Sequence, residues 1–469
     1  MDPRIASLKA RLKASGQADA RAARDAVRAL AVPRLAGTEA GDRVERWIRR
    51  RFERLGFETR LLPFAFSSLP GRYGWTLLAA GLAAASLASA WLLAGGRPFL
   101  SAGALLLPLA AAAYAARRAS AWTSGLPWGR LEGRNMVFTR PGGTVRYLIA
   151  AHRDSKSQPT STGARLRASA LAALGWATLG LLAAHGAAGA AAAALGAWAD
   201  GRLPATLLDA ARELLGPALS WNPPPALLGV VAGVTAAAAA FVALSWAGNE
   251  SPGALDNATG VVALLALAER LRDRQDVGYL VTDAEELALA GARAAAPEVT
   301  PLVGIINLDG LDDDGPVHVV ERYGLPRRGR APHLAAALLT AAAGLELDIQ
   351  RHDAPRGILL EHSAYSDAGV PSLTVARGPR SALGRIHRPS DRAETIDGRG
   401  VASIVALIEG ALHLLEDPHA PAPAPPLLPG RAHPSARDLR PAADPQRTPL
   451  FAHRPAEAPL PLAEDSDYG

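Results

Sequence analysis

Residues 277–291, which read VGYLVTDAEELALAG, decide the fold. The apolar, β-rich run VGYLV ends in a polar turn, and a helical pattern with small residues follows. Glu285 and Glu286 are adjacent at this strand-to-helix corner. Neighbouring carboxylates repel each other unless a cation lies nearby, so one can bind a metal ion while the other acts on a metal-bound water. Taken alone, such a pair is more often a solvated helix start, where acidic side chains interact favourably with the helix dipole.

Length and composition restrict the class of protein. The chain has 469 residues, enough for one large or two ordinary domains. It contains no cysteine, which excludes disulfides and thiolate metal sites, so any metal ion must bind histidine and carboxylate ligands. The formal net charge of +6 is mild and the arginines are spread along the chain, which argues against a nucleic-acid partner. The first forty residues read as polar, Arg-rich helix rather than as a signal peptide.

Strand and helix patterns alternate along much of the chain. This order predicts an α/β fold with a mixed, mainly parallel sheet flanked by helices. Strands are expected at residues 57–66, 136–138, 145–151, 277–281, 302–308 and 371–376. Helices are expected at residues 1–34, 37–56, 260–272, 331–344 and 400–415.

Two apolar insertions interrupt the α/β pattern. We expect N-terminal helices and a first strand at 1–72, a transmembrane hairpin at 73–118, an α/β segment at 119–166, a second transmembrane hairpin at 167–247, the remaining α/β segment at 248–416 and a disordered Pro/Ala-rich tail at 417–469. Residues 203–219 are amphipathic and predict an interfacial helix. All nine tryptophans except Trp47 lie between Trp75 and Trp246, mostly near the ends of apolar runs, as in an aromatic belt. Ala-rich soluble helices that pack on each other are the alternative.

Candidate metal ligands lie near the ends of the predicted strands. In a parallel sheet the loops at the C-terminal ends of the strands share one edge. Two histidines and several carboxylates that converge there would suit a pair of zinc ions. Each residue alone also has a structural explanation, such as a helix cap. The candidates are His152, Asp256, Glu285, Glu286, Asp309 and His387.

Five motifs of the chain, in the order AHRDS, GALDNATG, DAEELALAG, NLDG and HRPSD, resemble those of a known family. They are similar to the motifs of the co-catalytic zinc exopeptidases of metallopeptidase family M28, which includes bacterial leucyl aminopeptidases. The resemblance covers roughly residues 37–416 outside the insertions. It implies two zinc ions, with His152 and Asp309 on one, Glu286 and His387 on the other, and Asp256 bridging both.

The resemblance also implies two further roles. Asp154 would orient the His152 ring, and Glu285 would act as the general base and then protonate the leaving amine. One departure concerns residues 360–362, which read LEH where the family often has Ser-Asp-His. Glu361 keeps the charge on a longer arm, which bears on the shape of the pocket more than on the metal ions.

The leading hypothesis is a membrane-anchored di-zinc aminopeptidase that acts on peptides. A carboxypeptidase or a glutaminyl cyclase of the same fold is an alternative, although such cyclases use one zinc ion and this chain keeps both His152 and Asp309. A non-catalytic membrane scaffold is another, which the intact Glu285 argues against. A transporter is disfavoured because the apolar runs carry almost no charge apart from His185.

The arrangement of the insertions predicts the membrane topology. The segments on either side of each insertion build one sheet, so each insertion must cross the bilayer an even number of times, giving about four spans. The arginines that flank the apolar runs on the side of the α/β domain outnumber those on the opposite side. The positive-inside rule therefore places the α/β domain in the cytoplasm. These flanking residues are Arg72, Arg117, Arg118, Arg165 and Arg167.

The second hairpin follows the HRD motif and ends just before Asp256, so we expect the bilayer to lie close to the site and restrict access to short peptides. Replacing residues 167–247 with a short linker should then relax the preference for short substrates. Hydrolysis rates for a ladder of peptide lengths would measure this preference. An unchanged preference in a folded, zinc-loaded variant would contradict the hypothesis.

Overall fold

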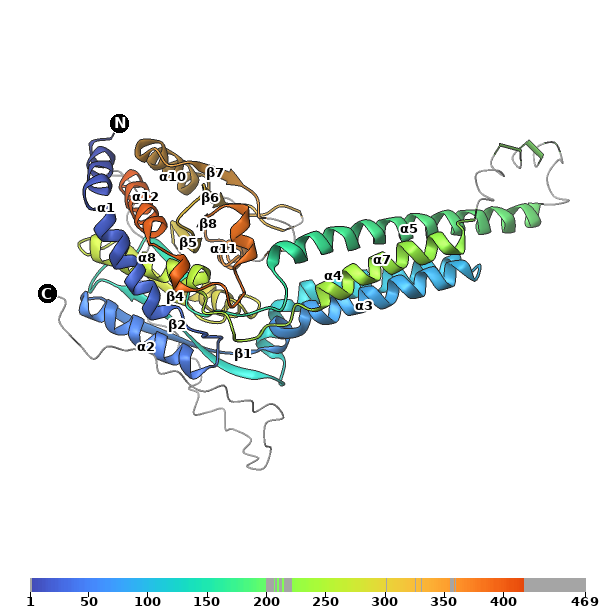
Figure 1. Ribbon diagram of the computed structural model, residues 1–469, viewed down its shortest axis with the longest axis horizontal. Helices are drawn as coiled ribbons and strands as arrows, with labels where there is room; N and C mark the ends of the chain where they lie inside the picture. The colour runs from blue at the N-terminus through green and yellow to red at the C-terminus, as the bar shows by residue number, and fades with distance from the viewer. Residues whose placement is uncertain are drawn as a thin grey trace, which may run out of the picture.

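The computed structural model describes residues 2–416, apart from residue 200, most of residues 201–221, and residues 301, 325, 330, 355–357 and 359. An α/β domain lies at one end of the molecule and a bundle of long helices extends away from it (Figure 1). The predicted interfacial helix at 203–219 falls mostly outside the described residues, and the predicted tail at 417–469 falls outside them entirely.

An eight-stranded sheet forms the centre of the α/β domain, with the strand order β1-β2-β4-β3-β5-β8-β6-β7. The four central strands β4, β3, β5 and β8 run parallel, which confirms the predicted mixed, mainly parallel α/β fold. Their C-terminal ends therefore meet at one edge of the sheet. The strands are β1 (Glu58–Ser67), β2 (Arg130–Thr139), β3 (Tyr147–His152), β4 (Val277–Thr282), β5 (Gly304–Leu311), β6 (Val317–Val320), β7 (Ile349–His352) and β8 (Ser372–Arg377).

Helices cover both faces of the sheet, so the central strands are apolar on both sides. In β3, Ile149 belongs to the larger core cluster, whereas Leu148 and Ala150 belong to the smaller cluster on the opposite face. The larger cluster lies beneath α1 (Pro3–Leu30), α2 (Glu39–Arg54), α8 (Thr259–Arg270), α10 (Pro332–Leu345) and α12 (Arg399–Leu414). The smaller cluster lies beneath the short helices α9 (Ala290–Ala295) and α11 (His362–Asp367).

The structure corrects several local predictions. The helix expected directly after Glu285 and Glu286 begins only at Ala290, because the backbone N–H groups of both glutamates bond to Asp154 and Ala284 has a positive φ of 56°. Asp309 lies within β5 rather than after its end. The strand expected at 136–138 is the ten-residue β2. Strands β6 and β7 and helix α11 were not anticipated from the sequence because each is too short to show a period.

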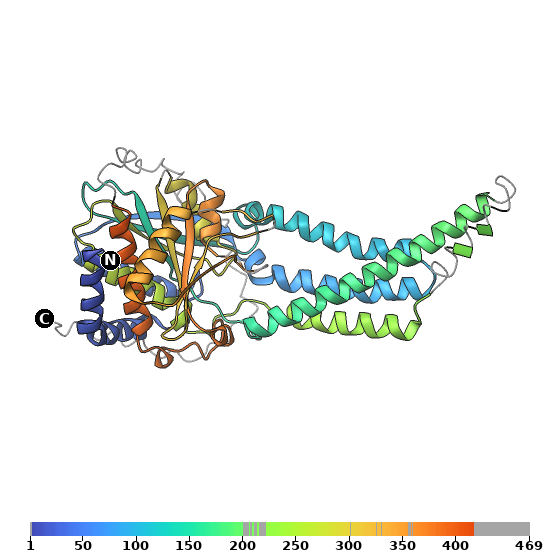
Figure 2. The same ribbon diagram turned by 90° about the horizontal axis from the view of Figure 1, so that it is seen from above.

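The two apolar insertions form the helical bundle. Its helices are α3 (Leu69–Ala94), α4 (Pro98–Gly125), α5 (Thr162–Ala199) and α7 (Pro225–Ala243). Among the described residues these four helices are long and apolar enough to cross a membrane, by length and composition. All four leave the same end of the α/β domain (Figure 2). At the base of the second hairpin, Ser157 and Gly248 exchange two backbone hydrogen bonds of 2.9 and 2.8 Å, so the chain leaves and re-enters the domain at one place.

Phe52 provides a test of the core between α2 and the sheet. Its ring is fully buried and stacks on Phe138 with centroids 3.9 Å apart. We expect Phe52→Ala to lower the free energy of unfolding by about 3–5 kcal/mol, because it leaves a cavity. The control Leu61→Ala, on the more exposed side of β1, should change it by no more than about 0.5 kcal/mol. Chemical denaturation in detergent would measure both, and equal losses would contradict this account of the core.

Candidate metal centre

The sheet edge brings together all six side chains that the sequence singled out. His152 is the last residue of β3, and Asp309 lies in β5 beside it. Glu285 and Glu286 follow β4, and His387 lies in the loop that follows β8. The sixth, Asp256, lies in an irregular turn at residues 254–258, just before α8, and is joined to Asn257 by a cis peptide bond.

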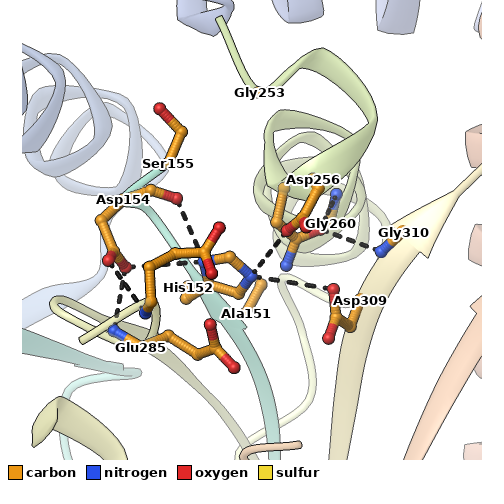
Figure 3. Close-up of polar contacts among 12 residues, drawn as sticks. Ala151, His152, Asp154, Ser155, Gly253, Asp256, Gly260, Glu285, Asp309 and Gly310 are labelled. Atoms are coloured by element: carbon orange, nitrogen blue, oxygen red, sulfur yellow. Dashed lines mark hydrogen bonds and ion pairs between the residues drawn. The ribbon is translucent and has the colours of Figure 1, made fainter. Parts of the chain in front are cut away.

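These donors form two groups that share Asp256. In the first group, Nε2 of His152 lies 3.2 Å from Oδ1 of Asp256 and 3.7 Å from Oδ1 of Asp309 (Figure 3). In the second, Nε2 of His387 lies 3.0 Å from Oδ2 of Asp256 and 3.3 Å from Oε1 of Glu286. Within each group the donor atoms all lie within 4.8 Å of one another. One oxygen of the Asp256 carboxylate thus faces each group.

The donor set fits a pair of divalent cations. Nitrogen and oxygen donors at these positions are the ligand types that zinc binds in the absence of cysteine. Oε1 of Glu286 is buried without a hydrogen-bond partner among the described residues, and it points into the second group. Burial alone lowers the pKa of His152, yet the charge of Glu285 and the bonded carboxylates raise it well above its usual value. The site therefore carries an excess of negative charge that a cation would balance.

Asp154 positions the two glutamates as well as the histidine ring. Its backbone carbonyl lies 3.1 Å from Nδ1 of His152, and its carboxylate lies 3.5 Å from the same atom. The carboxylate also accepts hydrogen bonds from the backbone N–H groups of Glu285 and Glu286, at 3.0 and 3.1 Å. Asp154 therefore fixes the loop after β4 on the end of β3.

The environment separates the pKa values of the two adjacent glutamates. Burial raises the pKa of Glu285 well above its usual value, and the charge of Glu286 adds to this effect. Burial also acts on Glu286, but the positive charges of His387 and Lys156 outweigh it and lower its pKa to about 2. Two carboxyl groups with pKa values moved apart in this way are suited to different tasks, one as a proton carrier and one as a permanent anion.

Two cations that sequence reasoning missed, one partly and one fully buried, hold this edge together. Nζ of Lys156 lies 2.6 Å from Oε2 of Glu286. The guanidinium of Arg34 is fully buried and donates to the backbone carbonyls of Arg153, at 2.6 Å, and of Gly253, at 2.9 Å. Arg34 therefore joins the loop after β3 to the turn that carries Asp256. No sequence pattern identifies it, because its partners are backbone atoms of distant segments.

Two further acids hold segments of the site in place through hydrogen bonds. Asp391, in the HRPSD motif, accepts hydrogen bonds from the backbone N–H groups of Leu255 at 2.7 Å and Asp256 at 3.1 Å. The motif alone gives no role to Asp391. Glu361 is fully buried and accepts a hydrogen bond of 2.6 Å from the hydroxyl of Thr282, and burial raises its pKa to about 7. The longer arm of Glu361 thus reaches the end of β4.

A parallel α/β sheet that carries histidine and carboxylate donors at its C-terminal edge is the architecture of a metal-dependent hydrolase. Residues 241–411 match the model of peptidase family M28. This match confirms the resemblance inferred from the motifs, and it supports activity as a peptidase. The match begins after most of the apolar helices, so His152 lies outside it. No curated protein matches the chain.

Several solved structures are similar to this chain at low identity. An aminopeptidase from Aneurinibacillus sp. strain AM-1 is 13% identical, with 88% of this chain and 97% of that chain covered and a TM-score of 0.47. A glutaminyl cyclase from Porphyromonas gingivalis is 15% identical, with 85% and 98% covered and a TM-score of 0.47. The zinc aminopeptidase BSAP from Bacillus subtilis is 12% identical, with 86% and 97% covered and a TM-score of 0.46.

Asp391 makes a pH-dependent contribution that can be measured. Burial raises the pKa of its carboxyl from the usual 3.8 to about 6, although its hydrogen bonds with the backbone oppose the rise. The native protein therefore holds this proton more tightly than the unfolded chain, so the contribution of Asp391 to stability declines as the pH rises from about 4 to about 6.

We compare the free energies of unfolding of Asp391→Asn and the parent with chelator present. As the pH rises through this range, we expect the difference between them to shift in favour of the variant by about 1–3 kcal/mol. The lost acceptor adds an offset that does not vary with pH. Denaturant titrations between pH 4 and 7 would show the shift. A difference between the two proteins that is independent of pH would contradict the raised pKa.

Proposed function

We propose that this protein is a membrane-anchored di-zinc exopeptidase, and specifically an aminopeptidase that removes N-terminal residues from peptides. The observation that best supports this proposal is the pair of donor groups that share the Asp256 carboxylate. Glu285 is buried beside them, and burial raises its pKa, so it provides a carboxyl group that can carry a proton.

In this proposal the five donors would hold two zinc ions. His152 and Asp309 would hold one ion, Glu286 and His387 would hold the other, and Asp256 would serve both. Bound zinc would polarise the scissile carbonyl and activate a water molecule. Lys156, through its contact with Oε2 of Glu286, leaves Oε1 of that carboxylate free to face the ion.

Glu285 carries the proton in the proposed reaction. Its carboxylate takes a proton from the attacking water and delivers it to the amine that leaves when the peptide bond breaks. Asp154 keeps Glu285 in place because it binds the backbone N–H groups of Glu285 and of its neighbour Glu286.

We propose that the four apolar helices cross a bilayer. Large apolar side chains such as Leu77, Leu107 and Leu181 are exposed on them, which suits contact with lipid. Polar contacts lie between the helices instead, where Nε1 of Trp176 donates a 2.8 Å hydrogen bond to Ser86. The basic residues near the domain-side ends of the helices, named above from the sequence, favour a cytoplasmic α/β domain.

One observation favours a carboxypeptidase as a second candidate. The Lys156 ammonium group lies beside Glu286 and its side chain keeps 17% exposure. A cation at the edge of a metal centre could bind the terminal carboxylate of a peptide. An aminopeptidase would instead release residues from the free amino end, so the order in which residues leave a peptide separates the two candidates.

The decisive comparison is between the parent and Glu285→Gln in detergent, assayed on aminoacyl-nitroanilides and short peptides. We expect the substitution to lower kcat by about 10²–10⁴-fold while two zinc ions remain bound, because it removes only the proton carrier. Chelator should abolish turnover and added zinc should restore it.

Mass spectrometry of the products gives the direction of cleavage. Release of N-terminal residues supports the aminopeptidase, and release of C-terminal residues supports the carboxypeptidase. Cyclisation of an N-terminal glutamine without hydrolysis would indicate a glutaminyl cyclase. A parent protein that binds no metal would overturn the proposal in favour of a scaffold.

A further inference from the structure

In both histidines of the candidate centre, Nδ1 has a hydrogen-bond partner, but the two partners come from different parts of the chain. Nδ1 of His152 faces the backbone carbonyl of Asp154, two residues away in the same loop. Nδ1 of His387 lies 3.0 Å from Oε1 of Gln158, a residue 229 positions away in the sequence. Gln158 is buried, with 7% exposure, and was not singled out by sequence reasoning.

The second contact of Gln158 fixes which way its amide faces. Its Nε2 atom lies 2.8 Å from the backbone carbonyl of Ser245, and a carbonyl can only accept a hydrogen bond. The amide nitrogen must therefore face Ser245, and the amide oxygen must face His387. An oxygen at that position requires a proton on Nδ1. When the ring is neutral, Nε2 therefore has the lone pair that would bind a metal ion held with Asp256 and Glu286.

Gln158 holds the backbone of His387 as well as its ring. The backbone N–H of Gln158 donates a 2.8 Å hydrogen bond to the carbonyl of His387, and its carbonyl accepts one of 3.1 Å from Arg388. His387 has a φ of 61°, in the left-handed region that residues other than glycine seldom adopt. These contacts hold His387 in a conformation that the isolated loop would rarely sample.

Gln158 and Ser245 both lie at the base of the second apolar hairpin. The hydrogen bond between them therefore links the metal centre to that hairpin. Gln158 lies four residues before α5 begins at Thr162, and Ser245 lies two residues after α7 ends at Ala243. The hydroxyl of Thr162 is itself 3.5 Å from Nδ1 of His387. The base of the hairpin thus forms the wall behind His387, whereas the support of His152 lies within its own loop.

We propose that Gln158 is a positioning residue for His387, and that its bond to the Ser245 carbonyl makes the zinc affinity of the Glu286–His387 group depend on the α5–α7 hairpin. The proposal rests on the di-zinc centre proposed above. It implies that a displacement between the ends of α5 and α7 alters one zinc site and leaves the His152–Asp309 site unchanged.

Zinc titration of the full-length protein, with a chromophoric chelator as competitor, tests the role of Gln158. We expect Gln158→Leu to weaken the binding of one of the two zinc ions by about 10–100-fold. The affinity for the other ion should stay within about threefold of the parent value. Gln158→Glu keeps an acceptor toward His387 and should restore most of the affinity. The matched control Thr162→Val removes the longer contact with Nδ1 and the 2.8 Å hydrogen bond from Arg165, and it should bind both ions as the parent does.

The outcomes separate this inference from the proposed function. Two unchanged sites in Gln158→Leu, or equal weakening of both sites, would overturn the positioning role. Failure of Gln158→Glu to recover affinity would also overturn it, because the acceptor would then not matter. A parent protein that binds no zinc overturns both proposals, whereas a parent that binds two zinc ions without turnover overturns only the proposed function.

The bilayer dependence is tested in nanodiscs of phosphatidylcholine with short or long acyl chains. A change in hydrophobic thickness alters the tilt of spanning helices and so displaces their ends. We expect the parent's affinity at the zinc site that Gln158→Leu weakens to differ several-fold between the two lipids, and this difference to disappear in Gln158→Leu. Equal affinities of the parent in both lipids would overturn the link to the hairpin.

Discussion

The crowding of carboxylates around Asp256 is the constraint on which the rest of the domain depends. Asp256, Glu285 and Glu286 are buried at one edge of the sheet, with Asp309 beside them, and like charges at such distances repel strongly when water is excluded. The chain holds them there with backbone hydrogen bonds. Asp154 and Asp391 each accept two successive backbone N–H groups, and the residues so held include both glutamates and Asp256. Arg34 then joins the two loops through their carbonyls.

This arrangement explains why the central fold could be predicted from the sequence. The strands that carry the donors are buried on both faces, so each appears as a continuous apolar run, and the first polar residues after a run mark the functional edge. His152 and Glu285 were found in this way. Asp256 and His387 lie in loops, and only the resemblance to the family assigned them partners.

The parts that could not be predicted depend on contacts between distant segments. A helix was expected at Glu285 because the local pattern favours one, but Asp154, 131 residues earlier, takes the N–H groups of Glu285 and Glu286. Gln158 shows no local signal because its partners are a ring 229 residues away and a carbonyl beyond the apolar hairpin. The last two strands at this end of the sheet, β6 and β7, have four residues each, which is too few to establish an alternating pattern.

The paired backbone bonds between Ser157 and Gly248 have an evolutionary consequence. Because the two ends of the second hairpin already meet, the intervening residues can be gained or lost without moving any strand of the sheet. A single insertion into a hairpin-free ancestor could therefore have produced this architecture while the sheet edge remained intact. Such an ancestor would have supported the ring of His387 in another way, since both Gln158 and the Ser245 carbonyl that orients it lie between Ser157 and Gly248.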